Sequence, residues 1–425
     1  MTGYLYSDNP SELDAMQSGL GLPRLYGNGV VPLGDSRMAA TTVDGSPFGE
    51  GRTPHVKTVH FLNVAAALND GLFSLRAGFG RSGWRSDQYL TYLDDALAVG
   101  AQFYPIFGVA NDIAQASTTG DTALAIFNRI RDAALKIVRA GRTPVLFTEP
   151  GGNAFTADQI TMMLEINQRL FEFVEGTRGA LLFDMASIMW DLSSAGFALK
   201  AGYTYDGLHL AALGSVAVGE AFGNFMRAHV NPLPALGGGR SRANGFLANP
   251  LFLTVTGGSL GTTGFTGSVP ASFSLTKGGT IAGSVSVVGA PDGRGKALQV
   301  DIASGAAGGY VSISQDATPG DFSAGDLVEF GSKIRVVSGA NNLRETRLNG
   351  SIGGEANPVA DGYNAGLYEA LPASLNGKTL TLRSLPFKLV AGFSWVGWQQ
   401  RITLAANGSA QALIWNPTLR KRFAW

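Results

Sequence analysis

The segment Gly34-Asp35-Ser36 follows a short apolar run, and its serine is the first residue with chemical potential in this chain. A serine hydroxyl attacks an ester carbonyl only when a base removes its proton, and a histidine imidazole does so near neutral pH. Farther along, the segment YDGLHL (205–210) places Asp206 three residues before His209. A carboxylate bonded to one ring nitrogen holds the imidazole in one tautomer. Ser36, His209 and Asp206 therefore suit the roles of nucleophile, base and orienting carboxylate.

The negative charge that develops on an attacked carbonyl oxygen needs fixed hydrogen-bond donors. Asn111, in FGVANDI (107–113), offers a side-chain amide just past an apolar run. The Gly-rich stretch RAGFGRSGWRSDQYL (76–90) offers Gly78, Gly80 and Gly83, where a substrate can approach the backbone closely.

Each of these segments also has an ordinary explanation when taken alone. A Gly-Asp-Ser tripeptide is common by chance, an isolated Asp-x-x-His pair often holds a core histidine, and Asn-Asp often caps a helix. We assign Asp35 to the turn and Glu149, in FTEPGGN (147–153), to capping or loop hydrogen bonding. The order of the four segments in one half of the chain favours catalysis.

This ordered set resembles the SGNH/GDSL hydrolases over residues 25–232. The resemblance implies a flavodoxin-like three-layer α/β/α fold. It also implies that Ser36 is the nucleophile with its own N–H in the oxyanion hole, and that His209 is the general base oriented by Asp206. Asn111 is then the side-chain donor of the oxyanion hole.

The resemblance is incomplete at two places. In GVAND (108–112), Gly108 lies three residues before Asn111, and Val109 stands where the family has glycine. In the Gly-rich stretch we choose Gly83 as the second backbone donor, because GWRSDQYL leads into a helix at the family's spacing. Gly80 is the second choice.

Composition excludes several other classes of protein. The chain has 425 residues and no cysteine, with 32 Lys and Arg against 32 Asp and Glu. The absence of net charge gives no reason to expect nucleic acid or an anionic membrane as a partner. Disulfides and thiol catalysis are excluded, and the four histidines lack the spacing of a zinc site. We expect neither a metal nor an organic cofactor.

The first half alternates apolar runs with helical periods, which predicts a parallel sheet covered by helices. Thr156 and Gln159 are positioned for a capping box. In the helix 121–141 the expected buried face is Leu124, Phe127, Ile130, Ala134, Leu135 and Val138. Expected strands are 29–33, 72–78, 101–108, 143–149 and 179–185, and expected helices are 121–141, 156–174 and 211–230.

The second half has a different pattern. Pro and Gly concentrate in 231–245, and short runs with period-2 alternation come after them, such as ALQVDIA (297–303). This predicts an antiparallel β-sandwich, of jelly-roll type. The expected divisions are an N-terminal segment 1–24, a catalytic domain 25–232, a linker 233–245 and a sandwich 246–425.

Two motifs in the second half invite functional interpretation. GGSLG (257–261) matches the G-x-S-x-G pattern, but no histidine occurs after it in the chain, so we treat the match as chance. Trp395 and Trp398 are candidates for stacking on a sugar, although core filling explains them equally well. Three residues apart in a strand, they face opposite sides, so at most one is a platform. The segments NGFLANPLF (244–252) and ALIWNP (412–417) loosely resemble carbohydrate-binding jelly rolls.

The sequence thus predicts a serine esterase that removes O-acyl groups, O-acetyl first among them, from a carbohydrate polymer. One alternative is a lipid or small-ester hydrolase of the same fold. Another is a non-catalytic glycan-binding tail or adhesion protein.

The Gly-rich sandwich without an N-terminal signal resembles bacteriophage or prophage tail proteins. The expected location is a virion tail or the extracellular space if the chain is phage-encoded, and the cytoplasm if it is cellular. A homotrimer would suit a tail spike, although no heptads demand one. No apolar run is long enough to insert into a membrane.

Overall fold

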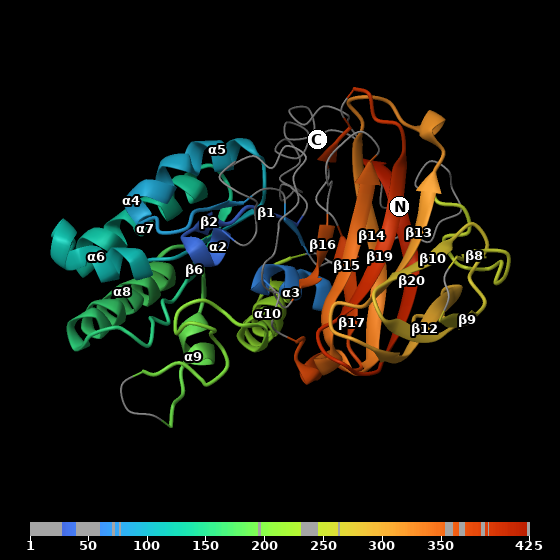
Figure 1. Cartoon of the computed structure of the whole chain (residues 1–425). Helices are drawn as coiled ribbons and strands as arrows, with labels where there is room; N and C mark the ends of the chain where they lie inside the picture. The colour runs from blue at the N-terminus through green and yellow to red at the C-terminus, as the bar shows by residue number, and fades with distance from the viewer. Residues whose placement is uncertain are drawn as a thin grey trace.

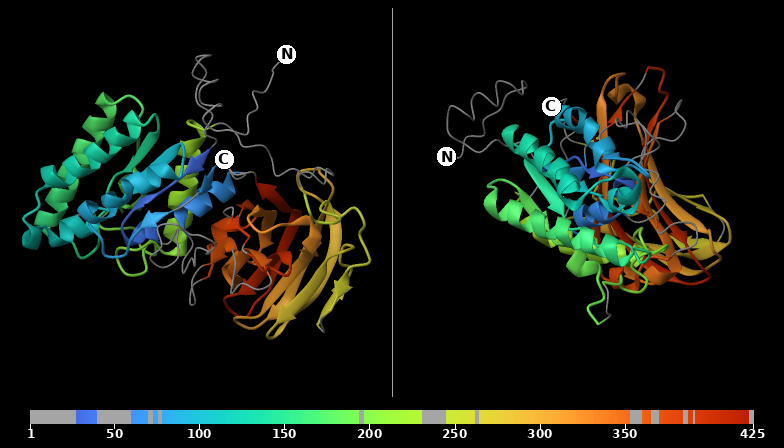
Figure 2. Two further views of the ribbon diagram at one scale, coloured as in Figure 1. Left: turned by 90° about the horizontal axis from the view of Figure 1, so that it is seen from above. Right: turned by 90° about the vertical axis from the view of Figure 1, so that its left-hand side faces the viewer.

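A computed structural model describes the structure of this chain, and it consists of an α/β part followed by a β-sandwich (Figures 1 and 2). The expected segment 1–24 and most of the expected linker 233–245 lie outside the described residues. Those residues are 28–39, 60–69, 73–75, 78–193, 197–230, 245–261, 264–352, 360–364, 370–383, 387–389 and 391–422.

The α/β part is built on a fully parallel sheet. The expected strand 29–33 is interrupted at Val31-Pro32, where proline supplies no N–H donor, so that two short strands run in series and each pairs with β5. Counting each interrupted strand once, the order is β3/β4, β1/β2, β5, β6, β7, the 2-1-3-4-5 order of flavodoxin-like sheets. The strands are β1 (Gly29–Val30), β2 (Leu33–Gly34), β3 (Ser74–Leu75), β4 (Phe79–Gly80), β5 (Phe103–Phe107), β6 (Thr143–Phe147) and β7 (Leu181–Phe183).

Helices cover both faces of this sheet because its strands are apolar on both sides. On β5, Tyr104 and Ile106 face one helical layer, and Phe103 and Phe107 face the other. The first layer is α4 (Ser86–Tyr89), α5 (Leu93–Ala98), α6 (Ala110–Thr119), α7 (Ala123–Arg139) and α8 (Ala157–Gly176). The second layer is α2 (Ser36–Ala39), α3 (Phe61–Leu68), α9 (Met185–Met189) and α10 (Ala212–Arg227).

The three expected helices are present as α7, α8 and α10, and the capping box at Thr156 and Gln159 is formed. The expected buried face of α7 is partly wrong. Leu124 is 46% exposed, whereas Ile126 and Ile137 are fully buried. Phe127, Ile130 and Ala134 are buried as expected, and packing against the sheet and α8 buries the neighbouring Ile126 and Ile137 in place of Leu124.

The second part consists of two sheets that face each other across one apolar core. Leu298, Val300 and Ile302 of β12 point into this core, as their alternation predicted. One sheet has the order β16-β15-β19-β13-β10-β8, and the other β17-β14-β20-β12-β11-β9 with β18 beside β14. The pairs are antiparallel except for β8–β10 and β9–β11.

The strands of the sandwich are β8 (Ser259–Leu260), β9 (Phe265–Gly267), β10 (Ser274–Gly278), β11 (Ile281–Gly289), β12 (Lys296–Gly305), β13 (Tyr310–Ala317), β14 (Leu327–Ser338), β15 (Leu343–Ile352), β16 (Ala360–Asn364), β17 (Thr379–Arg383), β18 (Phe387–Lys388), β19 (Val396–Leu404) and β20 (Ala410–Arg422).

The two parts meet along α3 and α10, which lie between the parallel sheet and the sandwich (Figure 1). Val64 of α3 and Val216 of α10 belong to the same apolar cluster as the sandwich core. Gly219 lets the two helices approach, because a Cβ there would overlap Val64. Lys378, just before β17, forms an ion pair with Glu220 of α10.

Candidate active site

Ser36 is the first residue of α2 and lies at the carboxyl end of β2, the edge where open α/β sheets bind ligands. Asp35 holds the turn: its Oδ1 accepts the N–H of Arg37 at 2.9 Å, and its carbonyl accepts the N–H of Met38 at 3.0 Å. The N–H of Ser36 itself, at the first helical position, has no intrahelical acceptor. It is therefore available to a bound group.

Three polar side chains meet at this turn. His209 Nε2 lies 2.7 Å from Ser36 Oγ, and His209 Nδ1 lies 2.6 Å from Asp206 Oδ2. Ser36 and His209 are 173 residues apart in the chain. Asp206 Oδ1 also accepts the backbone N–H groups of Leu208 at 3.0 Å and His209 at 2.7 Å. The result is a continuous chain of hydrogen bonds from the hydroxyl to the carboxylate.

These contacts specify where the protons are. The partial burial of Asp206 raises the pKa of its carboxyl, but the hydrogen bonds from His209 and Leu208 outweigh this effect and bring the pKa below its usual value. Asp206 is therefore a carboxylate near neutral pH, and it accepts the proton on Nδ1. That assignment leaves Nε2 of His209 unprotonated, as an acceptor for the Ser36 hydroxyl.

The two preferred oxyanion donors lie on the segments that come after β4 and β5. Gly83 has a φ of +78°, and a Cβ there would meet open space. Within the described part of the chain its N–H donates no hydrogen bond. Asn111, the second residue of α6, donates from Nδ2 to the carbonyl of Trp84 at 2.9 Å. An amide nitrogen carries two hydrogens, so one remains for a ligand.

Gly80, the second choice, has a packing role. A Cβ at this position would collide with the backbone of Met38 and Ala39 in α2. Gly108 has a similar requirement: its φ is +127°, and a Cβ would overlap the side chain of Asp35. The backbone at position 108, directly before Val109, therefore requires glycine.

A buried ion cluster underlies the serine turn, and its cation was missed in the sequence. Arg37 donates to both oxygens of Glu149, at 2.6 and 2.8 Å, and to Asp35 Oδ2 at 2.7 Å. All three side chains are almost completely buried. Burial lowers the pKa of Arg37, but the two carboxylates outweigh it and raise that pKa above its usual value. The sequence contained one signal for this cation, since Arg37 comes directly after Ser36.

Glu149 also organises the neighbouring loops, as its assignment to loop hydrogen bonding predicted. Its Oε2 accepts the N–H of Val109 at 3.2 Å, two residues before Asn111, and its Oε1 accepts that of Gly151 at 3.0 Å. Two residues farther on, the N–H of Asn153 donates to the carbonyl of Gly207 at 2.9 Å. One carboxylate thereby connects the segments that carry Ser36, Asn111 and His209.

His60, just before α3 in the same helical layer as α2, closes the cluster. Its Nε2 donates to the carbonyl of Arg37 at 2.9 Å, and its Nδ1 accepts the N–H of Leu62 at 3.2 Å, which caps α3. Burial lowers the pKa of His60 to about 4, against a smaller opposing effect of the Arg37 carbonyl. His60 is therefore neutral and serves as a structural link.

Asp112 links the two oxyanion candidates. Its carboxylate accepts the N–H of Ser86 at 2.9 Å and its Oγ at 2.5 Å, and it forms an ion pair with Arg129 at 3.1 Å. Burial raises the pKa of Asp112 to about 6, although the bonds from Ser86 and Arg129 oppose the rise. Since Ser86 lies shortly after Gly83 and Asp112 directly after Asn111, this contact sets their relative position.

The structure corrects one of the two tryptophan assignments. Trp398 is fully buried, donates from Nε1 to the carbonyl of Gly331 at 2.9 Å and packs on Phe273. It fills the sandwich core and has no face for a sugar. Trp395 is 38% exposed. Ser259 of the G-x-S-x-G match lies in β8 of the sandwich, far along the chain from His209.

The described ranges lack two other features, a cluster of metal ligands and a membrane-spanning helix. They contain no group of three or more His, Asp or Glu side chains arranged to hold a metal ion. Over the same ranges, no helix combines the length and the apolar character needed to cross a bilayer.

Comparison with known proteins gives similarities of structure only. No family model and no curated protein matches the sequence. A GDSL-like lipase from Bacteroides thetaiotaomicron is 16% identical, with a TM-score of 0.38 over 52% of this chain and 99% of that one. An acetyl xylan esterase is 17% identical, with a TM-score of 0.36 over 46% of this chain and 98% of that one.

The enzymatically active domain of a tailspike protein of bacteriophage CBA120 is 12% identical in sequence to this chain. The similarity covers 42% of this chain and 21% of that one, with a TM-score of 0.29. TM-scores this low do not establish a shared function, so the function of this chain has to be inferred from the arrangement of its own side chains.

Proposed function

We propose that this protein is a serine ester hydrolase of the SGNH/GDSL type. The observation that carries the proposal is the hydrogen-bonded series Ser36 Oγ, His209 Nε2, His209 Nδ1 and Asp206 Oδ2, with distances of 2.7 and 2.6 Å. A hydroxyl in contact with an imidazole that a carboxylate orients is an activated nucleophile.

In the proposed reaction Ser36 Oγ attacks the ester carbonyl while His209 takes the hydroxyl proton. The N–H groups of Ser36 and Gly83 and the amide of Asn111 stabilise the negative oxygen of the tetrahedral intermediate. His209 then donates its proton to the departing alcohol, which leaves an acyl-serine. A water molecule, deprotonated by the same histidine, releases the acid and restores Ser36.

We further propose that the substrates are O-acyl groups on a carbohydrate polymer, with acetyl as the acyl group. We propose that the sandwich, whose two sheets face each other across one apolar core, is a jelly roll that binds the carbohydrate. Trp395 remains the proposed aromatic platform. We also propose that residues 233–245 are a linker between two domains. The same proposal includes a location in a virion tail and assembly as a homotrimer.

One observation favours a second candidate, hydrolysis of lipid or other apolar esters. Leu192, Phe197 and Tyr205 on the segment before Asp206 are exposed apolar side chains, and the Tyr205 ring, 60% exposed, stacks on His209. A larger acyl chain would have apolar area to contact there.

The test compares hydrolysis of p-nitrophenyl acetate and p-nitrophenyl octanoate by the wild type and Ser36→Ala, between pH 5 and 9. We expect acetate to be preferred and the variant to lose about 10⁴-fold or more in kcat. We also expect the rate to rise with pH, because the proposed reaction needs an unprotonated imidazole as its base. Asp206 stays ionised over this range, because its pKa is lowered.

Preference for octanoate would favour apolar esters. Equal rates for the wild type and Ser36→Ala would reject the esterase mechanism and leave a glycan-binding tail or adhesion protein as the alternative.

A further inference from the structure

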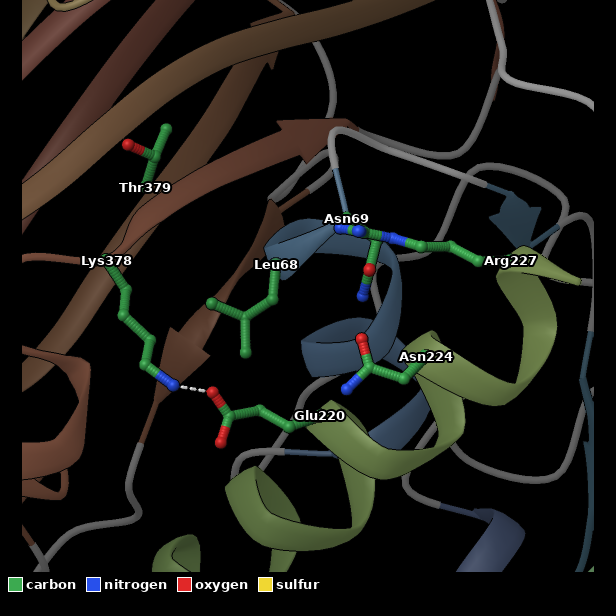
Figure 3. A pocket seen from close by; sticks show the side chains of 7 residues that line it. All are labelled: Leu68, Asn69, Glu220, Asn224, Arg227, Lys378 and Thr379. Atoms are coloured by element: carbon green, nitrogen blue, oxygen red, sulfur yellow. Dashed lines mark ion pairs between the residues drawn. The ribbon is translucent and has the colours of Figure 1, made fainter.

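A polar cavity lies where the two parts of the molecule meet, away from the serine site. Its volume is about 270 Å³, and its walls come from the ends of α3 and α10 and from the start of β17 (Figure 3). Asn69 is the C-cap of α3, Asn224 and Arg227 lie on the last turn of α10, and Lys378 and Thr379 belong to the sandwich. Neither part forms this cavity alone.

The hydrogen-bonding groups of the cavity are mixed. Arg227 and Lys378 donate, Glu220 accepts, and the amides of Asn69 and Asn224 do both. Lys378 is already paired with Glu220. Over the described residues, Arg227 has no carboxylate partner and the side chain of Asn224 has no hydrogen bond. Leu68 contributes an apolar wall. The side chains of Asn224 and Arg227 are both exposed and line the cavity, so a ligand can bond them in place of water.

The net charge of the cavity indicates a neutral ligand. The side chains carry one excess positive charge, but α3 and α10 run parallel and both end here, so their dipoles contribute about half a negative charge each. The sum is close to zero. Alternating donors and acceptors beside an aliphatic side chain suit a molecule with many hydroxyl groups, and the volume, at the low end for ligand sites, suits one sugar ring.

We propose that this cavity is a non-catalytic subsite for one sugar unit of a neutral glycan chain. The choice of a glycan as the ligand rests on the proposed function. The residues of the cavity, however, are separate from those of the serine site. Helix α10 sets the separation: it begins three residues after His209 and ends at Arg227. At about 1.5 Å per residue its length of roughly 24 Å keeps the bound sugar well away from Ser36. Such a subsite would hold the polymer while its acyl groups are removed.

The test is binding of hexaoses of glucose, xylose and N-acetylglucosamine, all without O-acyl groups, to the full-length protein, measured by saturation-transfer NMR and calorimetry. These probes carry no O-acyl ester, so the esterase does not consume them. We expect one of the three to bind, and expect Asn224→Ala and Arg227→Ala to weaken it by about tenfold or more.

Arg139→Ala is the matched control, because Arg139 is likewise the exposed last residue of a helix, α7, in the opposite layer. It should leave binding unchanged. Circular dichroism and the melting temperature check that each variant is folded.

The proposal is overturned if no hexaose binds, if Arg227→Ala and Arg139→Ala bind equally well, or if hexagalacturonate is preferred to every neutral chain. Failure of these experiments leaves p-nitrophenyl acetate hydrolysis untouched, and failure of that reaction leaves hexaose binding to be measured. The two proposals are therefore separable.

Discussion

Two buried glutamates, one in each part of the molecule, have very different surroundings. Glu149, after β6, accepts hydrogen bonds from Arg37 and from the backbone of Val109, both remote in sequence, and from the backbone of Gly151 in its own loop. Glu329, in β14 of the sandwich, accepts from Arg420, the residue opposite it on β20. Both carboxylates are almost fully buried, and Glu149 joins several segments of its part.

The difference arises from how the two folds place their backbone donors. In the sandwich, the strand ladders use the N–H groups, and a buried charge is neutralised by a side chain in register with it. At the carboxyl edge of the parallel sheet, loops leave N–H groups free, and a buried carboxylate collects them. In the sandwich the buried carboxylate of Glu329 therefore pairs with the residue opposite it on the next strand. In the α/β part the buried carboxylate of Glu149 holds the loops of the site together.

The largest effect expected from this comparison is that of Glu149→Gln. It leaves buried Arg37 with one carboxylate, and removing one partner of a buried ion pair costs about 3–5 kcal/mol. We expect that loss in the free energy of unfolding by urea, with a kcat for p-nitrophenyl acetate at least about tenfold lower in the folded protein. Glu329→Gln is the control: Arg420 is partly exposed, so we expect about 1 kcal/mol and no change in kcat. Equal kcat values for the two variants would contradict the organising role of Glu149.

A comparable loss of stability is expected in the sandwich from an apolar residue. Trp398→Ala removes a fully buried indole and should lower the free energy of unfolding by about 3–5 kcal/mol. Trp395→Ala, three positions earlier and partly exposed, should change it by less than about 0.5 kcal/mol. Urea titration followed by circular dichroism measures both, and similar losses for the two would show that the sandwich core is not where we place it.

Asn111→Ala tests the site without disturbing the core. Loss of one oxyanion donor costs about 10²–10³-fold in kcat, with little change in KM. The lost bond to the Trp84 carbonyl should lower the free energy of unfolding by about 1 kcal/mol. Asn349→Ala removes a similar amide bond, to Gln399 in the sandwich, and should leave kcat unchanged. Steady-state kinetics with p-nitrophenyl acetate decides, and an unchanged kcat in Asn111→Ala would remove this donor from the mechanism.

His60 is expected to affect the pH dependence of stability. The pKa of His60 is about 4 in the folded protein and 6.5 as an ordinary histidine. The contribution of His60 to the free energy of unfolding is therefore fully present above pH 6.5. It is lost as the pH falls, and the loss reaches about 3 kcal/mol near pH 4. His60→Gln should flatten this dependence in urea titrations at a series of pH values. The sandwich half has no histidine, so an acid response that persists in full in His60→Gln must have another origin.

Much of the architecture was predictable because local patterns of apolar and capping residues determine it. The alternation in β12 predicted its inward face, and Thr156 with Gln159 predicted the start of α8. The face of α7 was only partly predictable, since packing against the sheet buries Ile126 and Ile137 in place of Leu124. The interruption of the first strand at Pro32 was also missed, although proline gives the reason.

For the site, the sequence by itself determined what lies within one turn. Asp206 and His209 are three residues apart, and the backbone between them brings carboxylate and imidazole together through short-range bonds. The sequence also identified Ser36 as the candidate nucleophile and Asn111 as the candidate amide donor, from their types and their order in the chain.

Only the tertiary structure decided which of these groups meet. It joined Ser36 to His209 across 173 residues, put Arg37 between two carboxylates, buried Trp398 and left Gly83 open while Gly80 packs against α2. The physical reason is that such contacts depend on the order and direction of parallel strands. Pairing brings distant strand ends to one edge of the sheet, and no local pattern encodes which strands are neighbours.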